Sequence, residues 1–265
     1  MPEAIGVPEE TATVAENVYG SRQRIDWIAR HLRRSDVVLE VGCGTGHMIC
    51  RPLARLGYDV HGIDIDAASV ERGQALLREE GLDPSILAAR SLSETALNPD
   101  ALIVSEVLEH LHDPEFDGLL AEMRARLPPG GRLLVTVPNG YGWFELEQLL
   151  WWRVGLGSLL FRSGICHLVE KTKSRWLGPE AVAAGPPSTL SSSPHVQRFT
   201  YRSITRRLAA AGFDVVERRG SVVLAGPFSN LLFAGVGPVL AANARWGGRL
   251  GPFASGFMLA CRRRP

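Results

Sequence analysis

The 265-residue sequence lacks several features that would assign it to a class of proteins. Its 29 basic residues are balanced by 28 acidic ones, which leaves a net charge of +1. The basic excess typical of nucleic-acid-binding proteins is therefore missing, and no nucleic-acid partner is expected. The four cysteines show no CxxC spacing, which indicates reduced thiols in a cytoplasmic protein. Residues 1–10 contain neither a basic region nor an apolar run, so no signal peptide is expected.

What the sequence does contain is a regular alternation of short apolar runs with amphipathic stretches. Strands are predicted at 37–41, 59–63, 85–89, 101–104, 132–137, 213–219 and 256–262. Helices are predicted at 17–34, 47–56, 67–80, 115–127 and 201–211. This order predicts an α/β fold with a doubly wound, seven-stranded and mostly parallel sheet.

Two segments, 140–200 and 220–254, interrupt this alternation after the fifth and sixth strands. Loops at that edge of an open α/β sheet tend to cover the ligand. We therefore expect a single domain over 1–265, with 1–35 as an N-terminal helical cap and the two segments as lid or substrate insertions.

Both insertions are strongly apolar, and 220–244 contains no charged residue. That length would suffice for a membrane span, although several glycines and prolines interrupt it. Three other interpretations remain open: lid helices that pack on the core, an apolar acceptor pocket, or a surface that rests on a bilayer. For the last, the arginines at 262–264 would favour anionic lipid.

Three glycines lie between the first strand and the next helix, at Gly42, Gly44 and Gly46. Glycine permits a tight turn and the close approach of a ligand to the backbone, and a following helix N-terminus favours negative charge. Asp64 ends the next strand, where a carboxylate can accept hydrogen bonds from a ribose diol. The dinucleotide fingerprint G-x-G-x-x-G is not matched, because His47 stands where its third glycine would be. An ordinary structural turn is the alternative interpretation.

The segment 40–46 resembles motif I of the class I S-adenosylmethionine-dependent methyltransferases. The resemblance extends to 62–66, 106–110 and 127–133, and it is weaker over 195–262. It implies the Rossmann-like methyltransferase fold and S-adenosylmethionine as the cofactor.

The resemblance also implies roles for individual residues. Asp64 would hold the ribose hydroxyls and Ile65 would pack on the adenine. The family's usual acid after the third strand is missing, and Leu92 in Ser-Leu-Ser would supply backbone contacts instead. The methionine end of the cofactor would be held by Glu40, Gly42, Cys43, Gly44 and Gly46.

A cluster of two acids and a histidine, Glu106, Glu109 and His110, follows the fourth strand. On a helix these positions would share one face, so that the three side chains could bind one divalent ion, Mg²⁺, Mn²⁺ or Zn²⁺. The pattern is similar to the ubiquinone-biosynthesis O-methyltransferases and the small-RNA 2′-O-methyltransferases. The RNA group has a later histidine, which His195 would match. The alternative is a metal-free site in which Glu106 caps a helix and His110 is the base.

These features predict O-methylation of a small, apolar, hydroxylated acceptor such as a quinol precursor, a lipid or a secondary metabolite. Glu109 and His110 are the predicted catalytic residues. The alternatives are a sugar or glycolipid O-methyltransferase, a small-RNA methyltransferase, a non-catalytic cofactor-binding scaffold and an NAD-linked oxidoreductase. The expected location is cytoplasmic, with or without peripheral contact with a membrane, and the sequence does not indicate an oligomeric state.

Overall fold

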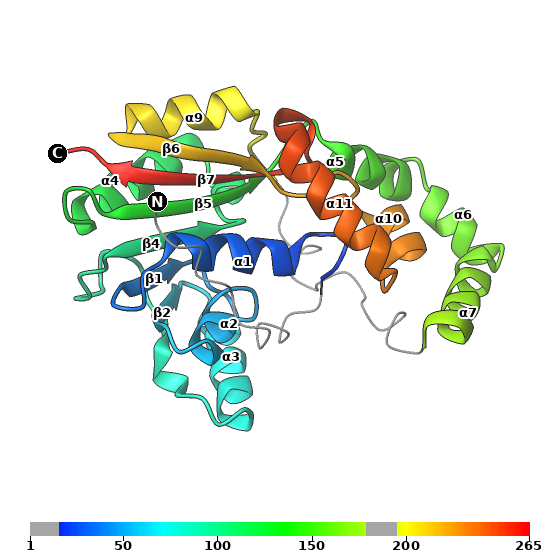
Figure 1. The fold of residues 1–265 in the computed structure, drawn as a ribbon, viewed down its shortest axis with the longest axis horizontal. Helices are drawn as coiled ribbons and strands as arrows, with labels where there is room; N and C mark the ends of the chain where they lie inside the picture. Colours follow the sequence, from blue (N-terminus) through cyan, green and yellow to red (C-terminus); the bar gives the residue numbers. More distant parts are fainter. Residues whose placement is uncertain (1–15, 179–194) are drawn as a thin grey trace.

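Seven strands form one sheet in the computed structural model, which describes residues 16–178 and 195–265 (Figure 1). The order is β3-β2-β1-β4-β5-β7-β6, and all neighbours are parallel except β7, which is antiparallel to β5 and β6. The strands are β1 (Val37–Val41), β2 (Asp59–Asp64), β3 (Leu87–Ala89), β4 (Ala101–Ser105), β5 (Arg132–Pro138), β6 (Phe213–Gly220) and β7 (Gly256–Arg263). The prediction of a seven-stranded, mostly parallel sheet is confirmed. The first 15 residues of the expected cap, and 179–194 of the first insertion, lie outside the described residues.

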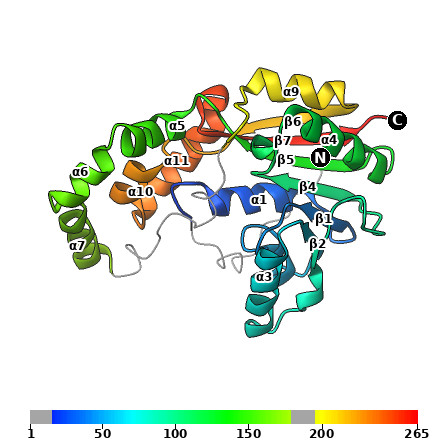
Figure 2. The same cartoon turned by 180° about the vertical axis from the view of Figure 1, so that it is seen from behind.

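Helices cover both faces of the sheet, and each face has its own core. Neighbouring strand residues alternate between the two cores, as Val38 and Leu39 do in β1. One core contains side chains of α1 (Ser21–His31), α2 (Cys50–Arg55) and α3 (Ala67–Glu79). The other contains side chains of α4 (Asp113–Arg126) and α9 (Tyr201–Ala210), which Figure 2 shows from behind. Strands buried on both faces are continuously apolar, which is why their residues were recognisable.

The helix after the glycine loop starts later than expected, at Cys50 and not at His47. The reason is Pro52. In a helix that began at His47, residue 52 would have to donate its N–H group to Met48 O, and proline has no N–H group. Starting at Cys50 places Pro52 in the first turn, where no such bond is needed.

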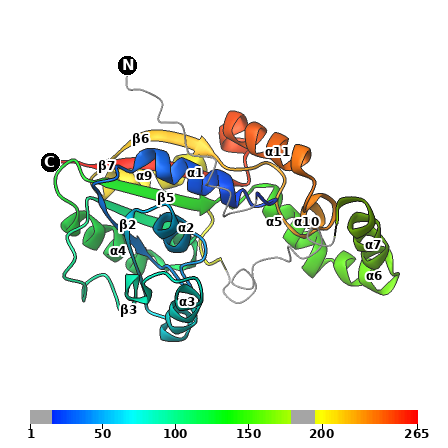
Figure 3. The ribbon, with the colours of Figure 1, turned by 60° about the horizontal axis from the view of Figure 1, so that its bottom comes forward.

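The two insertions form helices beyond the carboxyl ends of the parallel strands (Figure 3). The buried Glu147 carboxylate joins them, because it accepts hydrogen bonds from Trp143 in its own helix and from the Ser229 N–H (2.8 Å) in α10. Lys173 in α7 donates to Leu231 O at 3.0 Å. The elements are α5 (Trp143–Gln148), the π-helical turn η4 (Leu149–Arg153), α6 (Leu156–Arg162), α7 (Ile165–Leu177), α10 (Pro227–Phe233), α11 (Gly237–Leu250) and the 3₁₀ turn η6 (Gly251–Phe253).

The charge-free stretch 220–244 is divided between β6, α10 and α11. Among the helices of the described residues, none is both long and apolar enough to cross a membrane. All four cysteines are buried and free, in agreement with the expectation of reduced thiols.

Candidate active site

The glycine loop and Asp64 meet at one edge of the sheet, because β1 and β2 pair in parallel with Val41 opposite Ile63. The N–H groups of Gly42 and Cys43 both donate to Ile63 O, at 2.8 and 3.0 Å. These bonds turn the chain away from the strand and attach the loop to β2. The loop is thereby fixed by the backbone of the neighbouring strand.

Gly42, Gly44 and Gly46 all have left-handed backbones, with φ of 76°, 53° and 68°. Their surroundings differ. A Cβ atom on Gly42 would lie 2.5 Å from Val107 Cγ2, whereas a Cβ atom on Gly44 would meet nothing within 4 Å. Gly42 is therefore needed for packing against the segment that follows β4, and Gly44 is the glycine that a ligand can approach.

Asp64 holds the loop as well as facing it. Its Oδ2 accepts a hydrogen bond from Gly44 N at 2.7 Å, and its Oδ1 accepts one from Asp66 N at 2.8 Å. The neighbouring Ile65 side chain is 86% exposed, an apolar surface beside a carboxylate. Leu92 is different, because its side chain lies in the core and only its backbone can contact a ligand.

Glu40 lies under α2 and is fully buried. Its Oε2 accepts hydrogen bonds from the N–H and the thiol of Cys50, at 3.1 and 2.9 Å. Burial raises the pKa of Glu40 to about 8, despite these bonds, which lower it. Burial also raises the pKa of the Cys43 thiol, so that this cysteine is a packing group and not a nucleophile.

The expectation that Glu106, Glu109 and His110 share one helical face is wrong. Glu106 N donates to Thr136 O, which continues the contact between β4 and β5, and the φ of Glu106 is +56°. No other non-glycine residue of the described ranges has a positive φ. A short 3₁₀ turn, Leu108–His110, follows in place of an α-helix.

Glu106 has its partners on β5 and α1. Its Oε1 accepts a hydrogen bond from Thr136 Oγ1 at 2.9 Å and lies 3.4 Å from Arg24 Nη2. A left-handed backbone in a non-glycine residue costs roughly 1–3 kcal/mol and is found most often at functional sites.

Glu109, His110 and His195 do come together. One potential ligand atom of each lies within 4.8 Å of the others, a group that does not include Glu106. Glu109 is 1% exposed, and neither of its oxygens has a hydrogen-bond partner among the described residues. Burial, followed by the charge of Glu106, raises the pKa of Glu109 well above its usual value.

Backbone bonds place His195 beside this turn. The N–H groups of Val196 and Gln197 both donate to Glu109 O, at 2.9 and 3.0 Å. The rings of His110 and His195 are 5.2 Å apart, and His195 Nδ1 lies 3.2 Å from Glu145 Oε1 in α5. A histidine that binds a metal commonly has a carboxylate on its other ring nitrogen, and Glu145 is a carboxylate at one ring nitrogen of His195.

The donor set of one carboxylate and two imidazoles is suited to a divalent ion such as Zn²⁺ or Mn²⁺, and less to the all-oxygen environment that Mg²⁺ prefers. A buried carboxyl group without hydrogen-bond partners is costly as an anion, and either a proton or a bound cation removes that cost. The residues therefore fit a metal, without Glu106.

Two residues of the site were missed in the sequence. Arg24 of α1 is buried and contributes a positive charge near Glu40, Glu106 and Glu109. The available signal was an arginine next to Ile25 on the apolar side of an amphipathic helix. Glu145 had no signal, since its contact with His195 depends on how the first insertion folds.

A family model described as a methyltransferase domain matches residues 18–218. Among curated proteins, the ubiquinone biosynthesis O-methyltransferase of Chelativorans sp. (strain BNC1) is 33% identical over 104 residues, which is 38% of this chain and 40% of that protein. The ribosomal protein L11 methyltransferase of Thermus thermophilus is 31% identical over 116 residues, 44% of each chain. The chain thus spans less than half the length of these curated relatives.

Solved structures share the fold at lower identity. A structure described as a SAM-dependent methyltransferase from Methanosarcina mazei has a TM-score of 0.54 and 17% identity, over 90% of this chain and 97% of that one. The magnesium protoporphyrin IX methyltransferase of Synechocystis PCC 6803, with bound SAH, has a TM-score of 0.54 and 15% identity, over 92% and 81%. These similarities support the methyltransferase fold.

Proposed function

Because this chain belongs to the class I S-adenosylmethionine-dependent methyltransferases, we propose that it methylates a hydroxyl oxygen of a small, apolar acceptor. One observation carries the proposal: the glycine loop contacts the segment that carries Glu109 and His110. Val107 packs against Gly42, and the 3₁₀ turn with Glu109 and His110 begins at the next residue. A cofactor along the loop would thus have its reactive end beside these side chains.

Four groups of the described chain would hold S-adenosylmethionine. The Asp64 carboxylate faces the ribose hydroxyls, the exposed Ile65 side chain packs on the adenine, and the backbone of Leu92 borders it. Arg24 is a buried cation beside Glu106 at the end of β4, and it would pair with the carboxylate of the methionine end.

The reaction moves a methyl group from the positively charged sulfur to an acceptor oxygen, which loses its proton. In a metal-free site His110 would take this proton, with Glu109 Oε1 3.8 Å from its Nε2. With a divalent cation held by Glu109, His110 and His195, the cation would instead lower the pKa of the acceptor hydroxyl, and the proton would pass to solvent. The protein otherwise positions the two reactants in line.

The insertions favour an apolar acceptor. The exposed Leu146 of α5 and Leu149 of η4 follow Glu145, which contacts His195. Apolar walls with a few polar groups are typical of sites for small organic ligands. A sugar or glycolipid acceptor is the runner-up, since a vicinal diol would suit the same cluster.

We further propose that α6 and α7 rest on an anionic membrane surface. Ile165, Leu168 and Trp176 form an exposed apolar stripe along α7, and the exposed cations Lys171 and Arg175 lie alongside it. Residues 149–178 contain five cations and one carboxylate, although the whole chain has a net charge of only +1. Apolar side chains flanked by cations complement the negative surface of anionic lipids.

Calorimetric titration with S-adenosylmethionine tests the function, first after EDTA treatment and then with Mg²⁺, Mn²⁺ or Zn²⁺ restored. We expect binding in every case, and metal retained only while Glu109, His110 and His195 are intact. Absence of cofactor binding would contradict the proposal. Cofactor binding without metal would leave His110 as a base in a metal-free site.

Turnover then identifies the acceptor class. An alkyl-substituted catechol, a free sugar and a glycolipid are offered with labelled cofactor, and we expect transfer to the catechol. Glu109→Gln should abolish transfer and leave cofactor affinity unchanged. Tight cofactor binding with no transfer to any acceptor would favour the scaffold alternative.

A further inference from the structure

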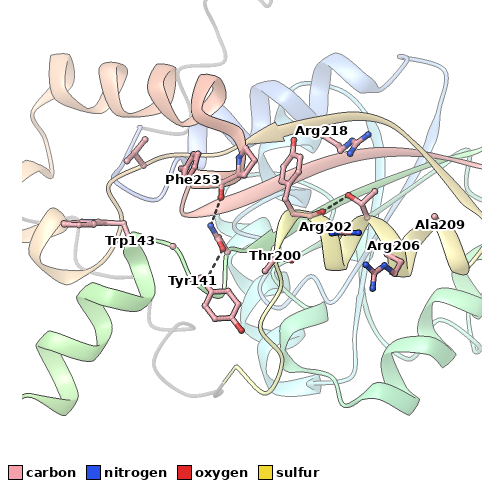
Figure 4. A pocket seen from close by; sticks show the side chains of 14 residues that line it. Tyr141, Trp143, Thr200, Arg202, Arg206, Ala209, Arg218 and Phe253 are labelled. Atoms are coloured by element: carbon pink, nitrogen blue, oxygen red, sulfur yellow. Dashed lines mark hydrogen bonds between the residues drawn. The ribbon is translucent and has the colours of Figure 1, made fainter.

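A cavity of about 900 Å³ lies between α9, β6 and the turn that follows β5. It shares no lining residue with the glycine loop, with Asp64 or with the Glu109–His110–His195 group. Figure 4 shows its two ends: Tyr141, Trp143 and Phe253 lie toward one, and Arg202, Arg206 and Arg218 toward the other.

The basic end contains three guanidinium groups, and no lining residue is acidic. Arg202 and Arg206 are one turn apart on α9, where like charges repel, and Arg218 adds a third charge from β6. None of the three has an ion pair or hydrogen bond within the described ranges.

A neighbouring arginine on the same helix shows the contrast. Arg207 pairs with Asp113 and Asp117 at 2.7 and 2.8 Å, and it lies 3.6 Å from the centre of the Phe116 ring. α9 therefore neutralises the arginine that faces α4 and leaves the two at the cavity without anions. Guanidinium groups bind phosphate and carboxylate in pairs of hydrogen bonds and remain charged at all ordinary pH values.

The aromatic end is held in place by a buried amide. Asn139 Nδ2 donates to Ala254 O at 2.8 Å and to Pro252 O at 3.1 Å, and its Oδ1 accepts from Tyr141 N at 3.2 Å. These bonds join the turn that carries Tyr141 and Trp143 to the η6 turn that carries Phe253. The Tyr141 and Phe253 rings, 70% and 77% exposed, are thus held by a fixed backbone. Aromatic side chains have few rotatable bonds, so on a fixed backbone they offer a flat ligand a surface at low entropic cost.

We propose that this cavity is a second ligand site, which binds a planar organic anion with its ring among the aromatic side chains and its phosphate or carboxylate at the arginines. The site is independent of the methyl-transfer site and of the function proposed for it. The ligand is recognised by its aromatic ring and its negative charge together, so a molecule that has only the ring or only the charge should bind weakly.

Calorimetry with phenyl phosphate tests this site, with phenol and inorganic phosphate as the two halves. We expect saturable binding of phenyl phosphate with a Kd of about 1 mM or tighter, and binding of either half at least about tenfold weaker. The affinity should fall with added salt, because the arginines are exposed.

Variants locate the binding. The double variant Arg202→Gln/Arg206→Gln should weaken phenyl phosphate at least about tenfold, as should Arg218→Gln by itself. Arg78→Gln, on an exposed arginine of α3, is the matched control and should bind like the parent protein. An unchanged S-adenosylmethionine titration shows that each variant is folded. Equal affinity in the double variant and the control, equal binding of phenol, or no binding of phenyl phosphate would each overturn the proposal.

Discussion

Asp64 and Asp66 are two residues apart and have different tasks. Asp64 faces the glycine loop, and Asp66 caps α3 by accepting a hydrogen bond from Ala68 N at 3.1 Å. Asp64→Ala removes a charged acceptor from the ribose, so the Kd for S-adenosylmethionine should rise about tenfold or more. Asp66→Ala should lower the free energy of unfolding and leave the Kd unchanged. Calorimetry and urea unfolding measure the two effects, and equal Kd values in both variants would remove the ribose assignment.

The raised pKa of Glu40 predicts that the stability of the protein depends on pH. The Glu40 carboxyl has a pKa of about 8 in the folded protein, against 4.5 as its ordinary value. Between these pH values the folded protein holds a proton that the unfolded chain has lost, so the free energy of unfolding falls as the pH rises. Glu40→Gln should flatten this decline, measured by urea unfolding at several pH values from 5 to 8. Glu122→Gln, on an exposed residue of α4, should not. Parallel slopes in the parent protein and Glu40→Gln would contradict the assignment.

At the scale of single residues, the sequence predicts the position of a side chain where that position follows from the end of a strand. Asp64 is recognisable because it closes β2 beside the glycine loop. Arg24 is not, because its contact with Glu106 joins α1 to the end of β4 and exists only after the helix packs on the sheet. The prediction that Glu106 shares a helical face with Glu109 and His110 was wrong because nothing in the neighbouring sequence indicates a positive φ at Glu106.

The loop between β1 and α2 predicts different outcomes for two glycines. Gly42→Ala would place a Cβ 2.5 Å from Val107 Cγ2 on a left-handed backbone, so it should destabilise the fold by more than about 1 kcal/mol. Gly44→Ala meets no neighbour, so its cost is limited to backbone strain of about 1 kcal/mol. Its methyl group instead enters the space that a ligand approaches. Thermal unfolding should show the larger loss for Gly42→Ala, and calorimetry should show weakened cofactor binding in a folded Gly44→Ala protein. The reverse order of stabilities would contradict this division.

Whole elements were predictable where apolar strands and helical stretches alternate regularly along the chain. The strands, α3, α4 and α9 lie close to their expected bounds, and Gly212 follows α9 with a φ of 88°, as expected of a glycine at a helix end. No individual helices were predicted from the sequence within the two insertions. These helices bury few side chains and expose many apolar ones, so an apolar residue in their sequence does not mark a covered face.

For the whole molecule, strand and helix alternation predicts the layers because a parallel sheet needs helices on both faces. It does not predict that β7 inserts between β5 and β6, since this depends on contacts between segments far apart in the chain. It also does not show that Glu147 joins the two insertions into one group of helices at the carboxyl edge of the sheet. Figure 1 shows this group of helices to one side of the sheet, with α6 and α7 at its outer end.

The exposed face of α6 and α7 makes a prediction for the molecule as a whole. The protein should sediment with vesicles that contain phosphatidylglycerol, and much less with phosphatidylcholine alone, because each cation near an anionic surface contributes about 1 kcal/mol. Lys171→Glu/Arg175→Glu should therefore lower the partition at least about tenfold. Phe161→Ser/Trp176→Ser should lower it too, since these side chains are 77% and 80% exposed.

Val216→Ser is the control for the vesicle experiment, on an exposed apolar residue of β6 outside this face, and it should sediment like the parent protein. Equal sedimentation with both lipids would mean that charge plays no part. A dimer in light scattering that Phe161→Ser/Trp176→Ser dissociates would mean that a second copy, and not a bilayer, covers the apolar stripe. Only sedimentation that depends on both the cations and the apolar side chains supports a membrane surface as the partner, because a bilayer offers negative charge and an apolar interior together.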